Sequence, residues 1–457
     1  MRKSYLVLLL VAMFAITSCD YNDGQLVVNP AEQAEEAIIN GKVPFSRAIS
    51  NADFVFKNID GTSAKKRKVR SVDVLTRSNP NSKIVSTRSS SLSEDDMPLA
   101  YVVNYENNEG FAILAADTKL PPVISIGDEG NFDTEGFANF VQNNGATRSD
   151  SDLNPAQEVQ YGIINNSLMI PSIDIDDYVT GVDTTIMLKC LPLVPTKWGQ
   201  GWPYNCCSFN AEGDLSSTGC VPLAGAQTLV SLCYHHNWRP TTQLSNTYTI
   251  DWYIINRMLF AGKFKFTNEK ETDDEVIAVA SLIRAIGEDI NADYDIRYPN
   301  VLADNINLCN TFNKLGLKDI IFTRNNDSIP ITQSHLFDMI VNKNYPIPTQ
   351  ANKSNSIGFG HSFIIDGWLR LEYSVLTYLM VEEAPGIIGR KPDNLQFSFD
   401  LVHVNFGEGG DLDGYYLPGA FDSSRDEFRD YAEENDLKNS SGKVYNMNVE
   451  YLIYDMP

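Results

Sequence analysis

The sequence is short of positive charge. It holds 36 lysine and arginine residues against 59 aspartate and glutamate residues, a formal net charge of -23. A surface that binds nucleic acid needs a basic excess to meet the phosphates, so this balance argues against nucleic acid as a partner. The composition is otherwise ordinary, and 457 residues are enough for two or three domains, each with its own core.

Long apolar runs are also absent, apart from one short run near the start. Residues 5–16 are apolar and follow Arg2 and Lys3, but they are too few to cross a bilayer. A basic start with a short apolar run is typical of a signal peptide, here residues 1–19. The small residues before Cys19 resemble a bacterial lipobox, in which this cysteine is lipidated and becomes the mature N-terminus. The alternative is a plain secretory signal with an incidental cysteine.

The cysteines do not have the spacing of a metal site. The chain has seven, and the adjacent Cys206 and Cys207 match neither a zinc site nor a redox pair. An exported protein can form disulfides, but this number does not require them. We therefore expect no disulfide framework, no structural metal and no cofactor.

The stretch from 217 to 227 places a cysteine at the start of an apolar helix. Pro222 is tolerated only in the first turn of a helix because it lacks an N–H, so the helix begins close to Cys220. There the sulfur faces unpaired N–H groups and the positive end of the helix dipole, which favour the thiolate. From this stretch alone, Cys220 is either a nucleophile or a small buried residue that begins a core helix.

Only five histidines are present to act as the base that a thiol nucleophile needs. His235 and His236 lie at the far end of the predicted helix, more than about 20 Å from Cys220 along its axis. His335 opens an amphipathic helix at a polar position, where we expect contact with solvent. Two histidines in predicted strands remain, and they are His361 and His403.

His361 follows a glycine-rich run and precedes an apolar strand. Glycines such as Gly360 let a bound peptide approach closely, and the buried strand would hold the imidazole still. His361 is therefore either a general base or a structural histidine. In the later strand, Asn405 lies two residues after His403 and on the same face, so it is either an orienting group or a turn residue.

The secondary-structure patterns divide the chain into an N-terminal unit and a C-terminal block. A basic and serine-rich stretch at about 63–95 has little apolar surface to bury, so we expect a flexible linker. Strand patterns follow it at 100–105, 111–117 and 123–127. In the C-terminal block, helix patterns at 221–237, 273–290 and 333–341 precede the strands. This order predicts an α+β fold without βαβ alternation.

Several motifs in one order resemble the streptopain family, bacterial cysteine proteases with a papain-like fold. They are Trp198-Gly199-Gln200-Gly201-Trp202, Gly219-Cys220-Val221, Gly360-His361-Ser362-Phe363 and His403-Val404-Asn405-Phe406-Gly407. The region from Tyr101 to Asp117 is similar to the inhibitory propeptide of that family. The resemblance covers most of the chain from about residue 95. It implies a small α+β propeptide domain at 20–180 and a papain-like catalytic domain at 181–457.

The resemblance also implies roles for individual residues. Cys220 would be the nucleophile, His361 the base, Gln200 a donor to the oxyanion and Asn405 the group that orients the imidazole. The expected substrate-binding residues are Gly360, Phe406 and Glu408. The family usually has tryptophan where Phe406 and Glu408 stand, so Glu408 places a negative charge near the cleft.

Together these features predict an exported cysteine endopeptidase made as a zymogen and held to the bacterial cell envelope only by a lipid on Cys19. Its partners would be protein or peptide substrates, with its own propeptide as an intramolecular inhibitor removed by cleavage between about 170 and 190. The alternative, motivated by Glu408, is a surface binding lipoprotein that keeps the protease fold with little or no turnover. An acyltransferase or amidase with the same thiol chemistry is a third candidate.

Overall fold

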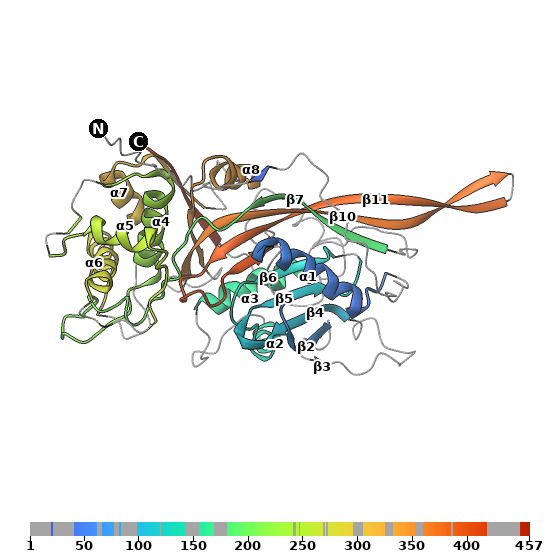
Figure 1. Cartoon of the computed structure of the whole chain (residues 1–457), viewed down its shortest axis with the longest axis horizontal. Coiled ribbons are helices and arrows are strands. Elements are labelled where there is room, and N and C mark those ends of the chain that lie inside the picture. Colours follow the sequence, from blue (N-terminus) through green and yellow to red (C-terminus); the bar gives the residue numbers. More distant parts are fainter. Residues whose placement is uncertain are drawn as a thin grey trace, which may run out of the picture.

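The computed structural model describes residues 20–21, 41–61, 66–76, 82–83, 98–118, 120–142, 155–168, 181–240, 244–245, 247–267, 270, 273–295, 305–324, 332–352, 360–384, 387–417 and 448–457. They form an N-terminal unit that ends with α3 (Pro155–Leu168) and a C-terminal block that begins with β7 (Gly181–Cys190). Both contribute strands to one antiparallel sheet (Figure 1). The lipidation site expected at Cys19 lies outside the described residues.

The sheet of the N-terminal unit contains the three strands that the sequence predicts. Its members are β2 (Val69–Thr76), β3 (Ser82–Lys83), β4 (Pro98–Tyr105), β5 (Phe111–Ala115) and β6 (Val123–Gly127). β4 and β5 form a hairpin closed by η2 (Glu106–Asn108), where Asn107 and Asn108 both have a φ of 58°. Asparagine tolerates this left-handed conformation better than most residues, which explains the turn.

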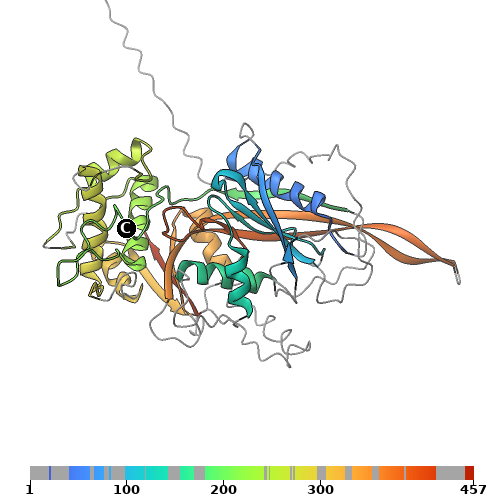
Figure 2. The same ribbon diagram turned by 90° about the horizontal axis from the view of Figure 1, so that it is seen from below.

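Helices cover both faces of this sheet (Figure 2). α1 (Phe45–Asp60) packs on one face, where the ring of Phe56 meets that of Tyr105 edge-on, with centroids 5.2 Å apart. α2 (Thr134–Gln142) and α3 pack on the other. Asn104 points to that second face and exchanges two hydrogen bonds with the backbone of Phe132, just before α2. The neighbouring residues Asn104 and Tyr105 of β4 therefore contact the helices on opposite faces of the sheet, because side chains of a strand point to the two faces in turn.

The structure corrects the flexible linker expected at about 63–95. Val69–Thr76 is strand β2, which pairs with β4, and its last three residues are buried. Just before it, the guanidinium of Arg67 lies 3.8 Å from the ring centroid of Phe56 and bonds to the Asp60 carboxylate at 2.8 Å. Residues 66–76 are therefore ordered despite their polar composition. Their apolar residues have the spacing of a strand, and Arg67 has fixed partners.

After β7, the helices of the C-terminal block precede its other strands, as predicted. They are α4 (Cys220–His236), α5 (Trp252–Phe260), α6 (Asp274–Asp289) and α7 (Asn305–Leu315). Every residue of α4 from Val221 to Cys233 is buried, so this helix lies inside the block. Gly225 allows α7 to pack against it closely, since a Cβ there would lie 2.7 Å from the Leu308 side chain. This packing fixes the N-terminus of α4, where Cys220 lies.

The strands follow the helices. They are β8 (Lys318–Arg324), β9 (Ile347–Asn352), β10 (Gly360–Ala384), β11 (Ile387–Asn405), β12 (Gly414–Tyr416) and β13 (Asn448–Asp455). α8 (Gln333–Phe337) and the π-helical turn η3 (Asp338–Asn342) lie between β8 and β9. β10 and β11 form a long hairpin that projects from the molecule (Figure 1), and β7, paired at one end with β1 (Asp20–Tyr21), lies along β10. The predicted α+β class is confirmed.

The pairing of β6 with β12 joins the sheet of the N-terminal unit to that of the C-terminal block. β6 of the N-terminal unit pairs with β12, so that Gly127 faces Gly414 and Ile126 faces Tyr415. Glycine is needed at 414 because a Cβ there would lie 2.2 Å from the carbonyl oxygen of Ile126. Since β12 is the neighbour of β11, the N-terminal unit is held directly beside the strand that carries His403 and Asn405.

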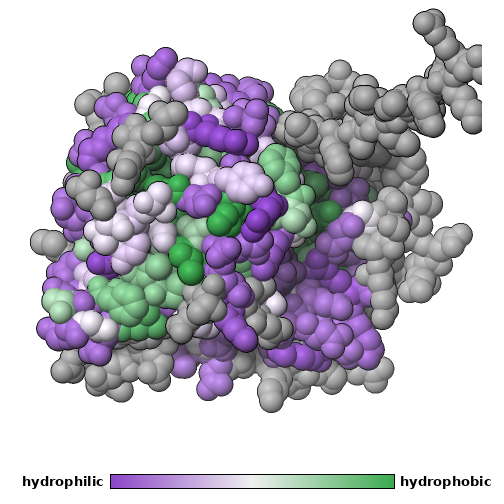
Figure 3. Space-filling model, turned by 60° about the vertical axis from the view of Figure 1, so that its left-hand side comes forward, coloured by the Kyte–Doolittle hydropathy of each residue, from purple (hydrophilic) through white to green (hydrophobic). Residues whose placement is uncertain are grey.

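Among the described residues, no helix has the length and apolarity needed to cross a bilayer. Five of the described cysteines, which are Cys206, Cys207, Cys220, Cys233 and Cys309, form no disulfide bond. Patches of apolar residues reach the surface on the side that carries α4–α7 (Figure 3), and Phe260 of α5 is 69% exposed.

Candidate active site

Cys220 begins α4, as the sequence predicts. Gly219 before it has a φ of 82°, in the left-handed region that favours glycine. Burial is the largest influence on the pKa of the Cys220 thiol and raises it. Backbone N–H groups of Ser362, Val221 and Cys220 itself donate to the sulfur and lower the pKa, whereas the Glu408 carboxylate raises it. The net direction is upward, so Cys220 is a thiol here rather than the thiolate that a helix start alone would favour.

His361 lies at the start of β10 and is buried. Its Nε2 is 2.7 Å from the backbone oxygen of Phe406, and the rings of Phe363 and Phe406 stack beside it. Burial lowers the pKa of His361 to about 4, so the imidazole is neutral at pH 7. A carbonyl oxygen can only accept a hydrogen bond, so Nε2 carries the proton and Nδ1 is the free acceptor.

The strand start brings the histidine and the cysteine together. Ser362, the residue after His361, supplies an N–H to the Cys220 sulfur. Among the described hydrogen bonds, none joins the imidazole to the thiol. The two groups are thus neighbours that are both uncharged, rather than an ion pair.

Asn405 does not contact the imidazole directly. Its Oδ1 accepts hydrogen bonds from Gln227 Nε2 at 3.1 Å and from the Gly407 N–H at 3.0 Å, and its Nδ2 donates to the Thr196 carbonyl at 3.1 Å. The direct bond to His361 that the sequence led us to expect is made by the carbonyl of Phe406 instead. Asn405 fixes the end of β11 and so acts on the imidazole through the next residue.

Gln227 is a site residue whose role the sequence did not predict. It is buried on α4, and its Oε1 accepts hydrogen bonds from the Thr196 hydroxyl at 3.0 Å and the Trp198 N–H at 3.3 Å. Together with its bond to Asn405, these contacts tie α4 to the segment before Gln200 and to the end of β11. A long polar side chain inside a largely apolar helix was the signal that could have identified it.

Gln200 lies at the site but its amide is already engaged. Its Nε2 donates to Glu408 Oε1 at 3.0 Å, and Gly199 and Glu408 form a bridge between their two segments. Its backbone oxygen accepts the Thr218 N–H at 3.0 Å, two residues before Cys220. Glu408 therefore holds the predicted oxyanion donor and also opposes ionisation of the nucleophile.

His403 is the centre of a buried charge cluster that the sequence did not predict. Its Nδ1 lies 2.6 Å from Asp366 Oδ1 on β10, and its Nε2 lies 3.1 Å from Asp128 Oδ2 of the N-terminal unit. Burial alone would lower the pKa of His403, but the two carboxylates outweigh it and raise the pKa to about 10. Gly367 makes room for this side chain, since a Cβ there would lie 2.7 Å from that of His403.

The segment after β6 links the N-terminal unit to the predicted base, His361. The Asp128 N–H donates to the carbonyl of Asp413 at 2.8 Å, and Glu129 forms an ion pair with Lys197. Asp413 in turn accepts the Phe406 N–H at 2.8 Å, and Phe406 is the residue that holds His361. Burial raises the pKa of Asp413 to about 7. A continuous set of contacts therefore runs from Asp128 to the imidazole.

The remaining predicted substrate-binding residues line the same region. Phe406 is fully buried, and its ring packs against Phe363 and Tyr416. Gly360 opens β10 and is half-buried, whereas residues 353–359 before it lie outside the described part of the chain.

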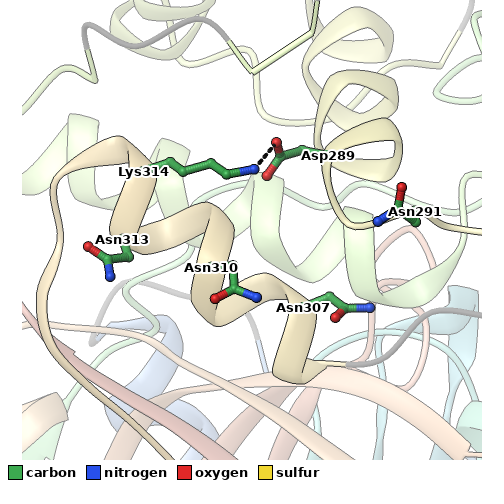
Figure 4. A pocket seen from close by; sticks show the side chains of 6 residues that line it. All are labelled: Asp289, Asn291, Asn307, Asn310, Asn313 and Lys314. Carbon is green, nitrogen blue, oxygen red and sulfur yellow. Dashed lines mark hydrogen bonds and ion pairs between the residues drawn. The ribbon is translucent and has the colours of Figure 1, made fainter.

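A polar pocket of about 530 Å³ lies on other elements, at the end of α6 and along α7. Its lining residues are Asp289, Asn291, Asn307, Asn310, Asn313 and Lys314 (Figure 4). The Asp289 carboxylate is engaged by Lys314 and by the Thr311 hydroxyl, each at 2.6 Å. The pocket contains none of the predicted site residues and is not a candidate for the active site.

Comparisons with known proteins identify a family for each of the two units. Residues 198–416 match the Peptidase C10 family, and residues 46–143 match the Spi protease inhibitor family. No curated protein sequence matches the chain. A prointerpain A fragment from Prevotella intermedia is 18% identical with a TM-score of 0.45, covering 78% of this chain and 96% of that one. The active interpain A cysteine protease of that organism is 21% identical with a TM-score of 0.36, covering 57% and 92%.

The first family match spans Gln200, Cys220, His361 and Asn405, and the second spans α1 to α2 of the unit docked beside them. The resemblance to streptopains that the motifs indicated is thereby confirmed. Residues 198–416 are thus a Peptidase C10 domain, that of a cysteine peptidase, and a Spi-type protease inhibitor domain at residues 46–143 precedes it.

Proposed function

We propose that the protein is an exported cysteine endopeptidase made as a zymogen, and that the structure corresponds to its latent form. The observation that carries the proposal is the position of Cys220 within a cysteine peptidase family match. Its sulfur lies at the start of a buried helix and receives the N–H of Ser362, next to His361. The substrates would be peptide bonds in proteins.

In the active form, the Cys220 thiol gives its proton to Nδ1 of His361, and the thiolate attacks the carbonyl carbon of the scissile bond. The Nε2–H of His361 remains bonded to the Phe406 carbonyl, which stabilises the imidazolium. The Cys220 N–H and the Gln200 amide bind the oxyanion. The imidazolium then protonates the leaving amine as the C–N bond breaks. Water, deprotonated by His361, hydrolyses the thioester, releasing the acid and the thiol.

Several contacts support latency. Burial keeps Cys220 and His361 uncharged, so the ion pair that attacks the substrate is not formed. The Gln200 amide is bound to Glu408 and is not free to meet an oxyanion. The N-terminal unit docks on His403 through Asp128 and extends the sheet at β12. Its departure would admit water and substrate to the site, which would restore the pKa of both catalytic groups toward their ordinary values.

Cleavage that releases the N-terminal unit is expected between about 170 and 190. β7 occupies 181–190 and is paired with β10 along its length. A protease needs an extended segment free of such pairing, so we place the cut before Gly181.

Export and lipid attachment at Cys19 complete the proposal and rest on the N-terminal sequence alone. Mass spectrometry of the purified protein's N-terminus would find a lipidated Cys19 in the membrane fraction. A Cys19→Ala variant would lose the lipid and leave that fraction. An unmodified N-terminus before Cys19 would contradict the anchor without affecting the peptidase assignment.

An active-site thiol probe tests the enzyme directly. After removal of the N-terminal unit, an epoxide probe of cysteine peptidases should label Cys220, and the protein should cleave casein. The variants Cys220→Ala and His361→Ala should lose self-processing and casein cleavage by at least about a hundredfold. Cys309→Ala, on α7, is the control and should keep both. Processed protein that neither takes up the probe nor cleaves casein would contradict the proposal.

The bond between Gln200 and Glu408 favours a second candidate, a surface binding protein with little turnover, because it occupies the predicted oxyanion donor. Cys220→Ala separates the two functions. A binding protein keeps its peptide ligand and its processing by other proteases, whereas the proposed enzyme loses maturation in the purified state.

A further inference from the structure

Two lysines of the C-terminal block lie together beside the predicted oxyanion donor. Lys197 is three residues before Gln200, and Lys265 is five residues after the end of α5. The Lys197 N–H donates to the carbonyl of Phe264 at 2.9 Å, which places the residue after Phe264 next to the segment that leads to Gln200. The side chains of the two lysines are 34% and 40% exposed, so both can be reached from solvent.

One carboxylate of the N-terminal unit bridges the two lysines. Glu129 forms an ion pair with Lys197 through Oε1, and its Oε2 lies 3.8 Å from Lys265 Nζ. The preceding residue, Asp128, forms an ion pair with His403 at 3.1 Å. The N-terminal unit thus covers three cations of the C-terminal block with two adjacent carboxylates, and all three cations stay in the block when the unit leaves.

The loop after β11 leaves room for this carboxylate. Gly410 has a φ of 95°, in the left-handed region that favours glycine. A Cβ at Gly410 would lie 2.9 Å from Lys197 Cδ and 3.4 Å from Glu129 Oε2, so a side chain there would crowd both groups. The Gly409 N–H donates to the Trp198 carbonyl at 3.0 Å and fixes the loop beside the lysine. The cations and the space in front of them therefore belong to the C-terminal block itself.

The C-terminal block has no equivalent carboxylate of its own for Lys197 among the described residues. Burial lowers the pKa of Lys197, but the carboxylates of Glu129, Asp128 and Asp413 outweigh burial, so that the pKa is raised. Asp413 alone of these belongs to the C-terminal block. It is buried and accepts the Phe406 N–H at 2.8 Å, and it forms no described ion pair with the lysine. Departure of the N-terminal unit would therefore leave two ammonium groups without the carboxylate that they share.

We propose that Lys197 and Lys265 form a substrate subsite for the carboxylate of a glutamate or aspartate side chain, and that Glu129 occupies this subsite in the latent form. The inference rests on the proposed peptidase function and names a class of substrate for it. Three residues of extended chain span at most about 10 Å, so the subsite serves a side chain within about four residues of the scissile bond.

The test uses the processed enzyme and an unphosphorylated synthetic casein peptide that it cleaves. Each position within about four residues of the scissile bond is made glutamate or glutamine in turn, and kcat/KM is measured for each peptide. We expect a preference for glutamate of about threefold to tenfold at one position or at two neighbouring positions, as two half-exposed ion pairs would supply. The preference should shrink in about 0.5 M sodium chloride, because salt screens exposed charges. Equal values for glutamate and glutamine at every position would overturn the proposal.

Charge variants connect the preference to the two lysines. Lys265→Gln should remove most of the preference for glutamate, and Lys265→Glu should reverse it, so that lysine is preferred at the same position. Lys318→Gln removes the same charge from an exposed position on β8 and should keep the preference. A preference for glutamate that survives the combined change of Lys197→Gln and Lys265→Gln would contradict the subsite.

A binding measurement distinguishes a failure of this inference from a failure of the proposed function. The Cys220→Ala protein, freed of its N-terminal unit by an added protease, should bind a dansyl-labelled glutamate peptide more tightly than the glutamine peptide, by the same factor as above. Preferential binding together with no cleavage by the protein that keeps Cys220 would contradict the peptidase and support the subsite. Cleavage of both peptides with equal kcat/KM would support the peptidase and contradict the subsite.

Discussion

Glu408 opposes the predicted roles of both Gln200 and Cys220. Its carboxylate accepts the Gln200 amide and raises the pKa of the Cys220 thiol, second to burial in that direction. Glu408→Gln removes the charge but keeps the size, so the thiolate fraction of Cys220 at neutral pH should increase. We expect alkylation of Cys220 in the full-length protein to become several-fold faster, measured by peptide mass spectrometry. Glu212→Gln, in an exposed turn, is the control; equal rates in all three proteins would contradict this role.

His403 should make the protein less stable as the pH rises above neutrality. Burial alone would lower its pKa, but Asp366 and Asp128 raise it from 6.5 to about 10. Between these values the folded state holds a proton that the unfolded chain releases. The free energy of unfolding is therefore fully supported below about pH 6.5 and falls toward pH 10, with a slope of at most about 1.4 kcal/mol per pH unit.

Urea unfolding of the His361→Ala protein from about pH 6 to about pH 9 measures this slope. The further substitution His403→Asn replaces the titrating ring by a neutral amide and should flatten the dependence in that window. It should also lower the stability at pH 6, because two buried carboxylates lose their partner. A slope that survives the substitution would have to come from other groups.

The segment after β6 holds the two units together through Asp128. Asp128 meets the charged His403, and its backbone bonds to Asp413, which holds Phe406 and thereby His361. Asp128→Asn keeps the shape and the backbone bond but removes the charge that pairs with His403. We expect self-processing of the purified full-length protein to become several-fold faster, followed by gel electrophoresis over time. Glu135→Gln, exposed on α2, is the matched control, and an unchanged rate for Asp128→Asn would show that the strand pairing alone holds the unit.

The elements that were predicted well are those with a strong local pattern. α4 begins at Cys220 because Pro222 is tolerated only in the first turn of a helix, and most of its buried residues are apolar. β4 to β6 have the composition of buried strands. β2 was missed because its neighbours are polar and because Arg67, which reads as a solvated charge, finds Asp60 and Phe56 only in the folded unit. A composition average over thirty residues hides such a strand.

For the molecule as a whole, the shared sheet predicts where maturation occurs. α3 ends at Leu168 and packs beside β10, whereas β7 begins at Gly181 and belongs to the C-terminal block by its pairing with β10. We expect the mature catalytic chain to start between these two residues and to keep β7. Mass spectrometry of the N-terminus after self-processing checks this. A start within β7 would require the strand to leave the hairpin before cleavage.

The sequence by itself predicted the fold class, the family resemblance and the four residues of the proposed chemistry, because each depends on residue type and spacing along the chain. Only the tertiary structure decided how those residues are engaged. Burial, which no local pattern measures, keeps Cys220 and His361 neutral. The partners of Gln200, Asn405 and His403 come from segments 37 to 275 residues away. Contacts between such distant segments exist only once the strands have paired.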